Sequence, residues 1–122
     1  MRVLHFAIGV GPPARFDLTA PSVEREIGTS GAEVRGITLS GLLEHLGWDY
    51  VDLMKIDIEG AEFAVLVDPS MRCVRAIIGE VHDTKAPAGY TTVEALLPDY
   101  DVRSSPAAGG EATMFHALRQ ST

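Results

Sequence analysis

The chain contains little of what several classes of protein require. Cys73 is the only cysteine, which excludes an internal disulfide and a metal site with two cysteine ligands. Lysine and arginine number 10 against 17 aspartates and glutamates, and the net charge of -7 without a basic run argues against nucleic acid or an anionic membrane as a partner. We therefore expect a cytoplasmic protein, in a reducing compartment, that binds no polyanion.

Long apolar segments are also missing. No stretch approaches the ~18 consecutive apolar residues of a membrane-spanning helix, and the N-terminal apolar run is too short for a signal peptide. At 122 residues with 46% hydrophobic content, the sequence is long enough for one domain with a core and too short for two. We therefore expect residues 1–122 to form a single domain.

Apolar periodicity and turn residues predict alternating strands and helices. Strands are expected at 3–8, 15–18, 51–58, 74–81, 100–103 and 112–118, and a polar surface loop over 19–36. Helices are expected from the N-cap Ser40 to Gly47, over 61–67 until Pro69, and from Thr91 or Thr92 to Pro98. The strand, helix, strand order predicts an α/β fold with a partial Rossmann-like sheet, mostly parallel, and the short last turn predicts an antiparallel C-terminal strand pair.

Charged side chains gather where the strands 51–58 and 74–81 end. In open α/β sheets, ligands bind beyond the carboxyl ends of parallel strands. Asp57 and Glu59 follow the first strand, while Glu80 and His82 share a face at the end of the second. A right-handed crossover makes these two strands parallel, so we expect the four side chains to converge and interpret them as the catalytic residues.

Lys55 precedes Asp57 by two residues and therefore shares its face of the strand. A lysine inside an apolar strand needs a partner, and Asp57 or an acid of the next strand is the candidate. A purely structural interpretation also stays open. In it, Lys55 and Asp57 form an ion pair, Gly60 permits a turn, and Glu59 and Glu62 favour the positive N-terminus of the next helix.

The segment VDLMKIDIEGAE, residues 51–62, resembles the central motif of the FkbM family of S-adenosylmethionine-dependent methyltransferases, whose usual form is close to idLLKIDVEGaE. Weaker blocks follow the family's pattern in the same order: HFAIGVGPPARFDL, VRGITLSGLLEHLG and RAIIGEVHD. The resemblance implies a methyltransferase sheet and O-methylation of a hydroxyl on a sugar or secondary metabolite. S-adenosylmethionine is then the cofactor, and a small-molecule hydroxyl acceptor is the partner.

The resemblance also implies roles for single residues. It places Asp57 and Glu59 near the cofactor methyl group and the acceptor, with Glu80 or His82 as the base. Asp57, Lys55 and Gly60 are then the expected cofactor-binding residues. The favoured interpretation includes no metal, although a divalent ion on the four converging side chains stays open because carboxylates and imidazole suit several metals.

The glycine-rich cofactor turn of such enzymes is not found in the sequence. Its only substitute, AIGVGPP at 7–13, is interpreted as a hairpin because the following residues lack an apolar helical face. By the resemblance, the chain begins at the family's third core strand, which leaves the strand 51–58 at an exposed sheet edge. The strand 3–8 fills that position, or two chains pair there as a homo-oligomer, and catalysis then needs an N-terminal half from another chain.

Two interpretations of other classes stay open. In one, the chain is a non-catalytic binding or assembly module that presents its acidic crevice or open edge to a partner. In the other, it is a metal-dependent hydrolase built on Asp57, Glu59, Glu80 and His82.

Overall fold

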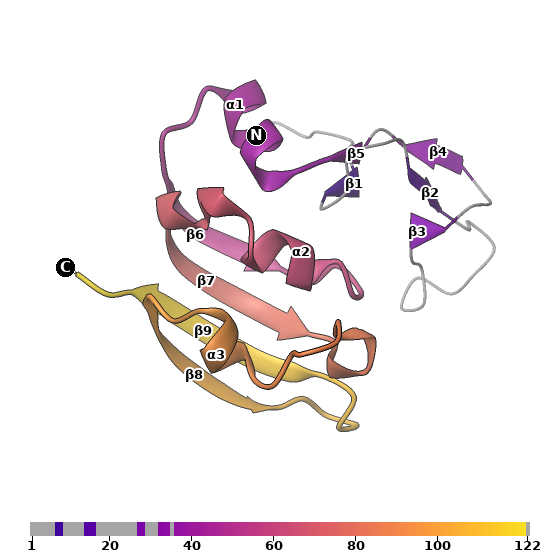
Figure 1. Cartoon of the computed structure of the whole chain (residues 1–122), viewed down its shortest axis with the longest axis vertical. Coiled ribbons are helices and arrows are strands. Elements are labelled where there is room, and N and C mark those ends of the chain that lie inside the picture. Colours follow the sequence, from indigo (N-terminus) through magenta and orange to yellow (C-terminus); the bar gives the residue numbers. More distant parts are fainter. Residues whose placement is uncertain (1–6, 9–13, 17–26, 29–31, 35, 122) are drawn as a thin grey trace.

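A four-stranded mixed sheet dominates the computed structural model, which describes residues 7–8, 14–16, 27–28, 32–34 and 36–121 (Figure 1). Its strands, in spatial order, are β6 (Val51–Ile56), β7 (Val74–Val81), β9 (Thr113–Arg119) and β8 (Tyr100–Pro106). β6 and β7 pair in parallel, whereas β9 runs antiparallel to both β7 and β8. The predicted parallel pair and the predicted antiparallel C-terminal pair are therefore confirmed.

The prediction of a mostly parallel sheet is not confirmed. β9 lies between β7 and β8, so two of the three pairings in this sheet are antiparallel. The physical reason is the hairpin that joins β8 to β9, because the returning strand pairs with the free edge of β7. The described structure is thus a mixed α/β fold in which β6 lies at one edge of the main sheet.

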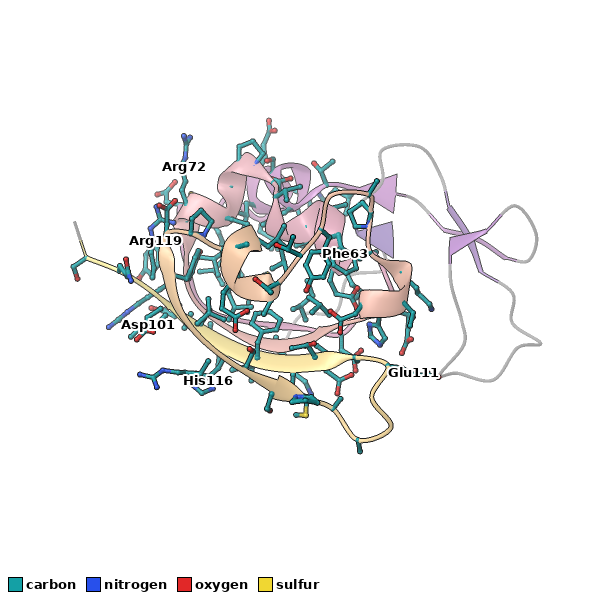
Figure 2. The ribbon with its side chains drawn as sticks, turned by 60° about the horizontal axis from the view of Figure 1, so that its bottom comes forward. Phe63, Arg72, Asp101, Glu111, His116 and Arg119 are labelled. Carbon is teal, nitrogen blue, oxygen red and sulfur yellow. The ribbon has the colours of Figure 1, made fainter. Side chains whose placement is uncertain are left out.

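Among the described residues, helices cover one face of the main sheet and leave the other face open. Figure 1 shows α2 (Glu62–Leu66) and α3 (Val93–Leu96) on the covered face, and their buried residues pack with Ile56, Ile77 and Phe115 of the strands. Figure 2 shows Phe63 on this side and His116 on the opposite side. The open face carries several exposed large apolar side chains, namely Leu53, Ile78, Met114 and Leu118.

Side-chain hydrogen bonds set the ends of the helices. The N-cap of α1 (Leu39–Leu46) is Thr38, whose hydroxyl accepts a hydrogen bond from the Gly41 amide at 3.0 Å. Ser40 is therefore not the cap, and its hydroxyl instead donates to Asp68 at 2.5 Å. Gly47, with a φ of 68°, ends the helix as predicted, because glycine adopts this left-handed conformation without steric cost.

The two later helices follow the same logic. Thr92 caps α3 by accepting from the amide of Ala95 at 3.2 Å, which confirms one of the two predicted caps. Pro69 does not end α2 directly, since α2 ends at Leu66 and Pro69 begins a short 3₁₀ helix, η2 (Pro69–Cys73). No helix within the described ranges is long and apolar enough to cross a membrane.

Short strands occupy the described parts of the first 37 residues. β1 (Ala7–Ile8) pairs in parallel with β5 (Gly36–Ile37), and β2 (Ala14–Phe16) lies antiparallel between β3 (Ile27–Gly28) and β4 (Ala32–Val34). The prediction of a hairpin at AIGVGPP is therefore wrong, since β1 and β2 join different sheets. The prediction of a loop over 19–36 is wrong in part, because β3 and β4 lie within it. Nor does β1 occupy the free edge of β6. The remaining residues of these predictions lie outside the described ranges.

Gly79 lets β7 approach β6 closely at the end where the charged residues follow. It pairs with Ile56, and a Cβ atom built on Gly79 would lie 2.1 Å from the carbonyl oxygen of Ile56. Any side chain at this position would push the two strands apart. The glycine thus helps to bring the carboxyl ends of β6 and β7 together, where the candidate site lies.

Candidate functional site

The chain leaves β6 through a tight turn that needs a glycine. Glu59 has a φ of 54° and Gly60 a φ of 107°, so both residues adopt positive φ, and confirm the predicted turn. A Cβ atom on Gly60 would lie 2.8 Å from Cδ of Lys85, whose side chain packs over the turn. The Lys85 ammonium donates to the carbonyl oxygen of Glu59 at 3.3 Å and lies 3.9 Å from its carboxylate.

Glu62 is the buried centre of the site. Its side chain is fully buried, and its carboxylate accepts hydrogen bonds from the amides of Ile58 at 3.3 Å and Gly60 at 2.8 Å. The same carboxylate lies 2.5 Å from Nδ1 of His82. Burial of a carboxylate is costly unless its oxygens are hydrogen-bonded, and three partners satisfy this one. Glu62 therefore joins the turn, the start of α2 and the end of β7.

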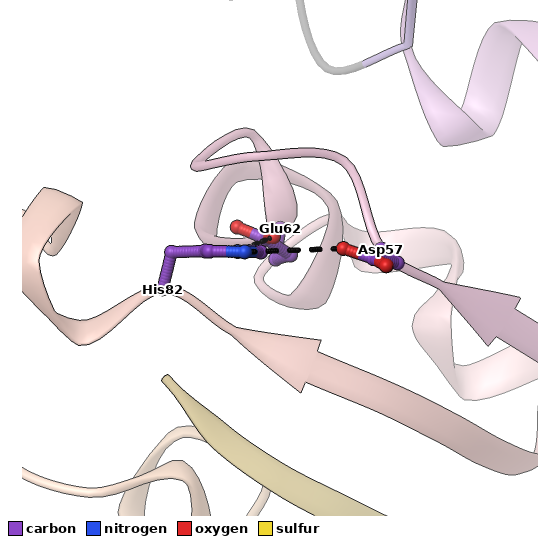
Figure 3. A group of neighbouring side chains, drawn as sticks. All are labelled: Asp57, Glu62 and His82. Carbon is purple, nitrogen blue, oxygen red and sulfur yellow. Dashed lines mark hydrogen bonds and ion pairs between the residues drawn. The ribbon is translucent and has the colours of Figure 1, made fainter. Parts of the chain in front are cut away.

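The contact with Glu62 orients the imidazole of His82. Because an ionised carboxylate can only accept, the N–H at Nδ1 donates the hydrogen bond to Glu62. Nε2 then points away from the core, at 3.3 Å from Glu59 Oε2, 3.9 Å from Asp57 Oδ1 and 4.0 Å from Glu80 Oε2. Figure 3 shows the imidazole tip beside Glu62, with Asp57 facing it from the end of β6. Nε2 is thus the ring nitrogen that faces the surrounding carboxylates.

The structure brings the four predicted residues together. Asp57, Glu59 and Glu80 all lie within 4.0 Å of His82 Nε2, so the expected convergence at the ends of two parallel strands is confirmed. Glu62 was assigned only to the helix N-terminus, and its contact with His82 was missed. The sequence signal was available, because Glu62 begins the helix directly after a glycine turn, where a carboxylate can turn back to bind the amides of that turn.

The expected role of Lys55 as an ion-pair partner is wrong. Lys55 is exposed on the open face of β6, because this edge strand is covered on one face only, and it makes no ion pair with Asp57 or with another described residue. Lys85 of the 3₁₀ helix η3 (Asp83–Lys85) instead supplies the ammonium that contacts the site, at Glu59.

Negative charge dominates the cluster. Four carboxyl groups surround one imidazole, and the ammonium of Lys85 contacts Glu59. Two like charges at about 4 Å repel with an energy on the order of 4 kcal/mol at an effective dielectric constant of about 20. The site therefore stabilises a positive charge at its centre, and it repels an anion that approaches the acidic end directly.

A hydrogen-bonded shell holds the segment that follows His82. The carboxylate of Asp83 accepts from the Tyr90 hydroxyl at 3.1 Å and from the Thr113 hydroxyl at 2.7 Å. Burial first, and then the hydrogen bond to Asp83 and its charge, raise the pKa of Tyr90 to about 12. The hydroxyl therefore keeps its proton at neutral pH. The Tyr90 ring also meets the ring of Phe63 edge-on at 5.0 Å, which anchors this shell to α2.

The cluster also has the composition of a metal site. Ligand atoms from Asp57, Glu62 and His82 all lie within 4.8 Å of one another. In an octahedral site with bonds of about 2.1 Å, adjacent ligand atoms lie about 3 Å apart and opposite ones about 4 Å. The distances of 3.3 to 4.0 Å from His82 Nε2 to the other carboxylates are in this range. Imidazole with carboxylates suits Mn²⁺, Fe²⁺ or Zn²⁺.

A groove of about 690 Å³ runs over the open face of the sheet beside the cluster. Asp57 and Glu80 line its acidic end, and Lys55, Arg103 and His116 line the remainder. The groove volume is within the range of small-molecule sites.

Comparison with models of protein families gives a match over most of the chain. The model of the family described as "Methyltransferase FkbM domain" matches residues 10–120. No curated protein and no solved structure matches the chain. The matched range contains all four strands of the main sheet and every residue of the acidic cluster.

Proposed function

We propose that this chain, which belongs to the FkbM methyltransferase family, is an O-methyltransferase domain that receives an acceptor hydroxyl at His82. The observation that carries the proposal is the orientation of the imidazole. Glu62 holds Nδ1 at 2.5 Å, and Nε2 faces the acidic opening at the carboxyl ends of β6 and β7. A hydroxylated small molecule of the sugar or secondary-metabolite class is the proposed acceptor.

In the proposed reaction, His82 is the general base. A hydroxyl oxygen that gains a methyl group must lose its proton, and Nε2 is the basic atom that accepts it. Glu62 keeps the other nitrogen protonated, which fixes the tautomer whose Nε2 lone pair is available. The resulting imidazolium is stabilised by Glu62 and by the carboxylates around Nε2. Asp57, Glu59 and Glu80 also accept hydrogen bonds and thereby orient neighbouring hydroxyls.

S-adenosylmethionine, the cofactor of the family, supplies an activated methyl group when it is bound. Its sulfonium and ammonium groups are cationic and its ribose hydroxyls are donors, so they suit the carboxylates of Asp57 and Glu59. Gly60 has no side chain of its own in the adjacent turn, over which Lys85 packs. The carboxylate acceptors of the cluster therefore suit these groups of the cofactor, and we propose Asp57 and Gly60 as its nearest contacts in this chain.

The experiment follows transfer of labelled methyl groups from S-adenosylmethionine to a panel of hydroxylated acceptors. His82→Gln is expected to lower methyl transfer by at least about 10²-fold, because general acid–base catalysis contributes 10²- to 10⁴-fold. His45→Gln is the matched control, since His45 is exposed on α1. Equal rates for His82→Gln and the intact chain would contradict the assignment of the base.

Calorimetry distinguishes the enzyme from a non-catalytic binding or assembly module. Binding of S-adenosylmethionine by the intact chain supports the methyltransferase. If no heat of binding appears at millimolar cofactor, the binding module is the better interpretation and the proposed enzyme function fails.

A metal-dependent hydrolase is the second candidate function. It is favoured by the mutual distances, within 4.8 Å, of ligand atoms from Asp57, Glu62 and His82. Titration with Mn²⁺ tests it, because a paramagnetic ion broadens the amide signals near its site. Selective broadening around His82 that disappears in His82→Gln supports this candidate. Uniform broadening over all acidic surfaces contradicts it.

A further inference from the structure

Basic side chains form a row across the open face of the main sheet. Lys55 of β6 pairs with Ile78 of β7, Ile78 with His116 of β9, and His116 with Arg103 of β8. Paired residues point to the same face, so these side chains lie next to one another across all four strands. All four are exposed. A row with two permanent cations and an imidazole is unexpected in a protein with a net charge of -7.

The groove of about 690 Å³ connects this row with the acidic cluster. Lys55 lies two residues before Asp57, and Ile78 lies two residues before Glu80. Two residues of strand span about 7 Å, so positive and negative groups occupy separate levels of one groove. Ile78 lies in the row and Met114 pairs with Glu80, so these side chains, with exposed fractions of 41% and 49%, supply apolar surface at the two levels of the groove.

The cations of the row are available to a ligand. Lys55 has no ion pair with any residue in the described ranges. Arg103 has a contact of 3.8 Å with Asp101, and both side chains are mostly exposed. Exposed ion pairs of this kind contribute little free energy, so Arg103 can exchange Asp101 for an anion at small cost.

We propose that the acceptor is a hydroxylated anion that lies along the groove. Its phosphate or carboxylate binds Lys55 and Arg103, and its hydroxyl reaches His82 at the acidic end. The inference rests on the proposed function for the role of His82, but the anion subsite is defined by different residues. The repulsion between an anion and the carboxylates at the acidic end fixes the direction in which the acceptor binds.

The test is a titration of the isotope-labelled full chain without cofactor, followed by amide chemical shifts. Glucose 6-phosphate, glucuronate and glucose are the three probes, since they share hydroxyls and differ in the anionic group. Glucose 6-phosphate or glucuronate is expected to shift the amides of Lys55, Ile78, Arg103 and His116, and the phosphate and carboxylate arms identify the preferred anion. Glucose is expected to cause no comparable shift.

Variants test the cations directly. Lys55→Gln with Arg103→Gln is expected to weaken binding of the anionic probe by about tenfold or more, because two charge contacts with the anion are lost. Arg72→Gln removes one charge on the other side of the molecule from His116, as Figure 2 shows, and is expected to leave affinity unchanged. Added salt weakens binding by the intact chain and has less effect on the double variant.

The outcomes separate this inference from the proposed function. If His82→Gln abolishes methyl transfer but binds the anionic probe with an affinity within about twofold of the intact chain, the result supports both the proposed function and the anion subsite. If the intact chain binds the anion but transfers no methyl group, the result supports the anion subsite alone. Equal affinity for glucose and glucose 6-phosphate, or unchanged affinity in the double variant, would overturn the inference. Binding of L-methionine at Lys55 without binding of either sugar anion would also overturn it, because the row would then serve the carboxylate of the cofactor.

Discussion

Replacement of Glu62 by glutamine tests whether the buried carboxylate holds the site together. The substitution keeps the size of the side chain and replaces one oxygen with an NH₂ group, which is a donor. Oε1 of Glu62 accepts from Ile58 and His82, and Oε2 accepts from Gly60. In either orientation, the NH₂ group of the glutamine side chain therefore faces another hydrogen-bond donor, and at least one hydrogen bond is lost.

The expected loss of stability follows from these contacts. In the less damaging orientation, the NH₂ group faces the amide of Gly60, which loses its acceptor at 2.8 Å beside a fully buried side chain. An unsatisfied buried donor costs about 1 to 3 kcal/mol, and the remaining bonds lose the contribution of the charge. We expect Glu62→Gln to lower the free energy of unfolding by about 2 to 3 kcal/mol, or the melting temperature by about 10 °C for a chain of this size.

The assay is urea unfolding followed by circular dichroism, with Glu44→Gln as the matched control. Glu44 is exposed on α1, so its substitution is expected to change stability by less than about 0.5 kcal/mol. A double-mutant cycle with His82→Gln isolates the contact between the two side chains, for which we expect about 1 to 2 kcal/mol of coupling. A loss in Glu62→Gln no larger than in Glu44→Gln would refute the reasoning that this carboxylate organises the turn.

Three further predictions concern other parts of the chain. Burial tends to raise the pKa of Asp68, but hydrogen bonds from Ser40 and Ser70 outweigh it and lower the pKa. The stability that Asp68 contributes is therefore present above the unfolded pKa of about 3.9 and is lost as pH falls. In urea unfolding, the free energy of unfolding of Asp68→Asn should approach that of the intact chain below that pH. Gly79→Ala is expected to lower the free energy of unfolding by more than about 2 kcal/mol, because the added Cβ would lie 2.1 Å from a carbonyl oxygen of β6. A melting temperature within 2 °C of that of the intact chain, which corresponds to roughly 0.5 kcal/mol, would contradict this prediction. The pKa of Tyr90 is raised to about 12, so the stability that its protonated hydroxyl contributes is complete below about pH 10 and is lost as pH rises toward 12. The difference in the free energy of unfolding between the intact chain and Tyr90→Phe should therefore narrow over that interval. A constant difference would refute this prediction.

The sequence predicts the convergence of the four side chains because short-range geometry determines most of it. Alternation along a strand places Glu80 and His82 on one face, and two apolar runs joined by a short helix predict adjacent parallel strands. Asp57 and Glu59 then reach the same edge. Each of these inferences uses a spacing of two residues or one crossover, and the structure confirms the convergence within 4.0 Å.

Longer-range features were less predictable. The position of β9 between β7 and β8 depends on which strand edge the returning hairpin finds, and the local pattern of residues is the same for either edge. Lys55 was assigned a buried partner because its strand is apolar, but the open face of β6 leaves it exposed. Whether a strand is covered on one face or on both is a tertiary property, and composition alone does not settle it.

Glu62 and His82 allow structural and chemical roles to be separated by experiment. Glu62 has three hydrogen-bond partners and is fully buried, so we expect its loss to lower the free energy of unfolding and to release the imidazole of His82 together. The Nε2 atom of His82, by contrast, lies 3.3 to 4.0 Å from the carboxylates of Glu59, Asp57 and Glu80 and makes no buried hydrogen bond to the turn, so we expect His82→Gln to change the free energy of unfolding less than Glu62→Gln does. If methyl transfer falls in His82→Gln while unfolding changes little, and both fall in Glu62→Gln, then His82 is the catalytic residue and Glu62 its positioning residue. If both variants lose stability equally and activity follows stability alone, the pair is a structural contact, and the base must be sought elsewhere in the chain.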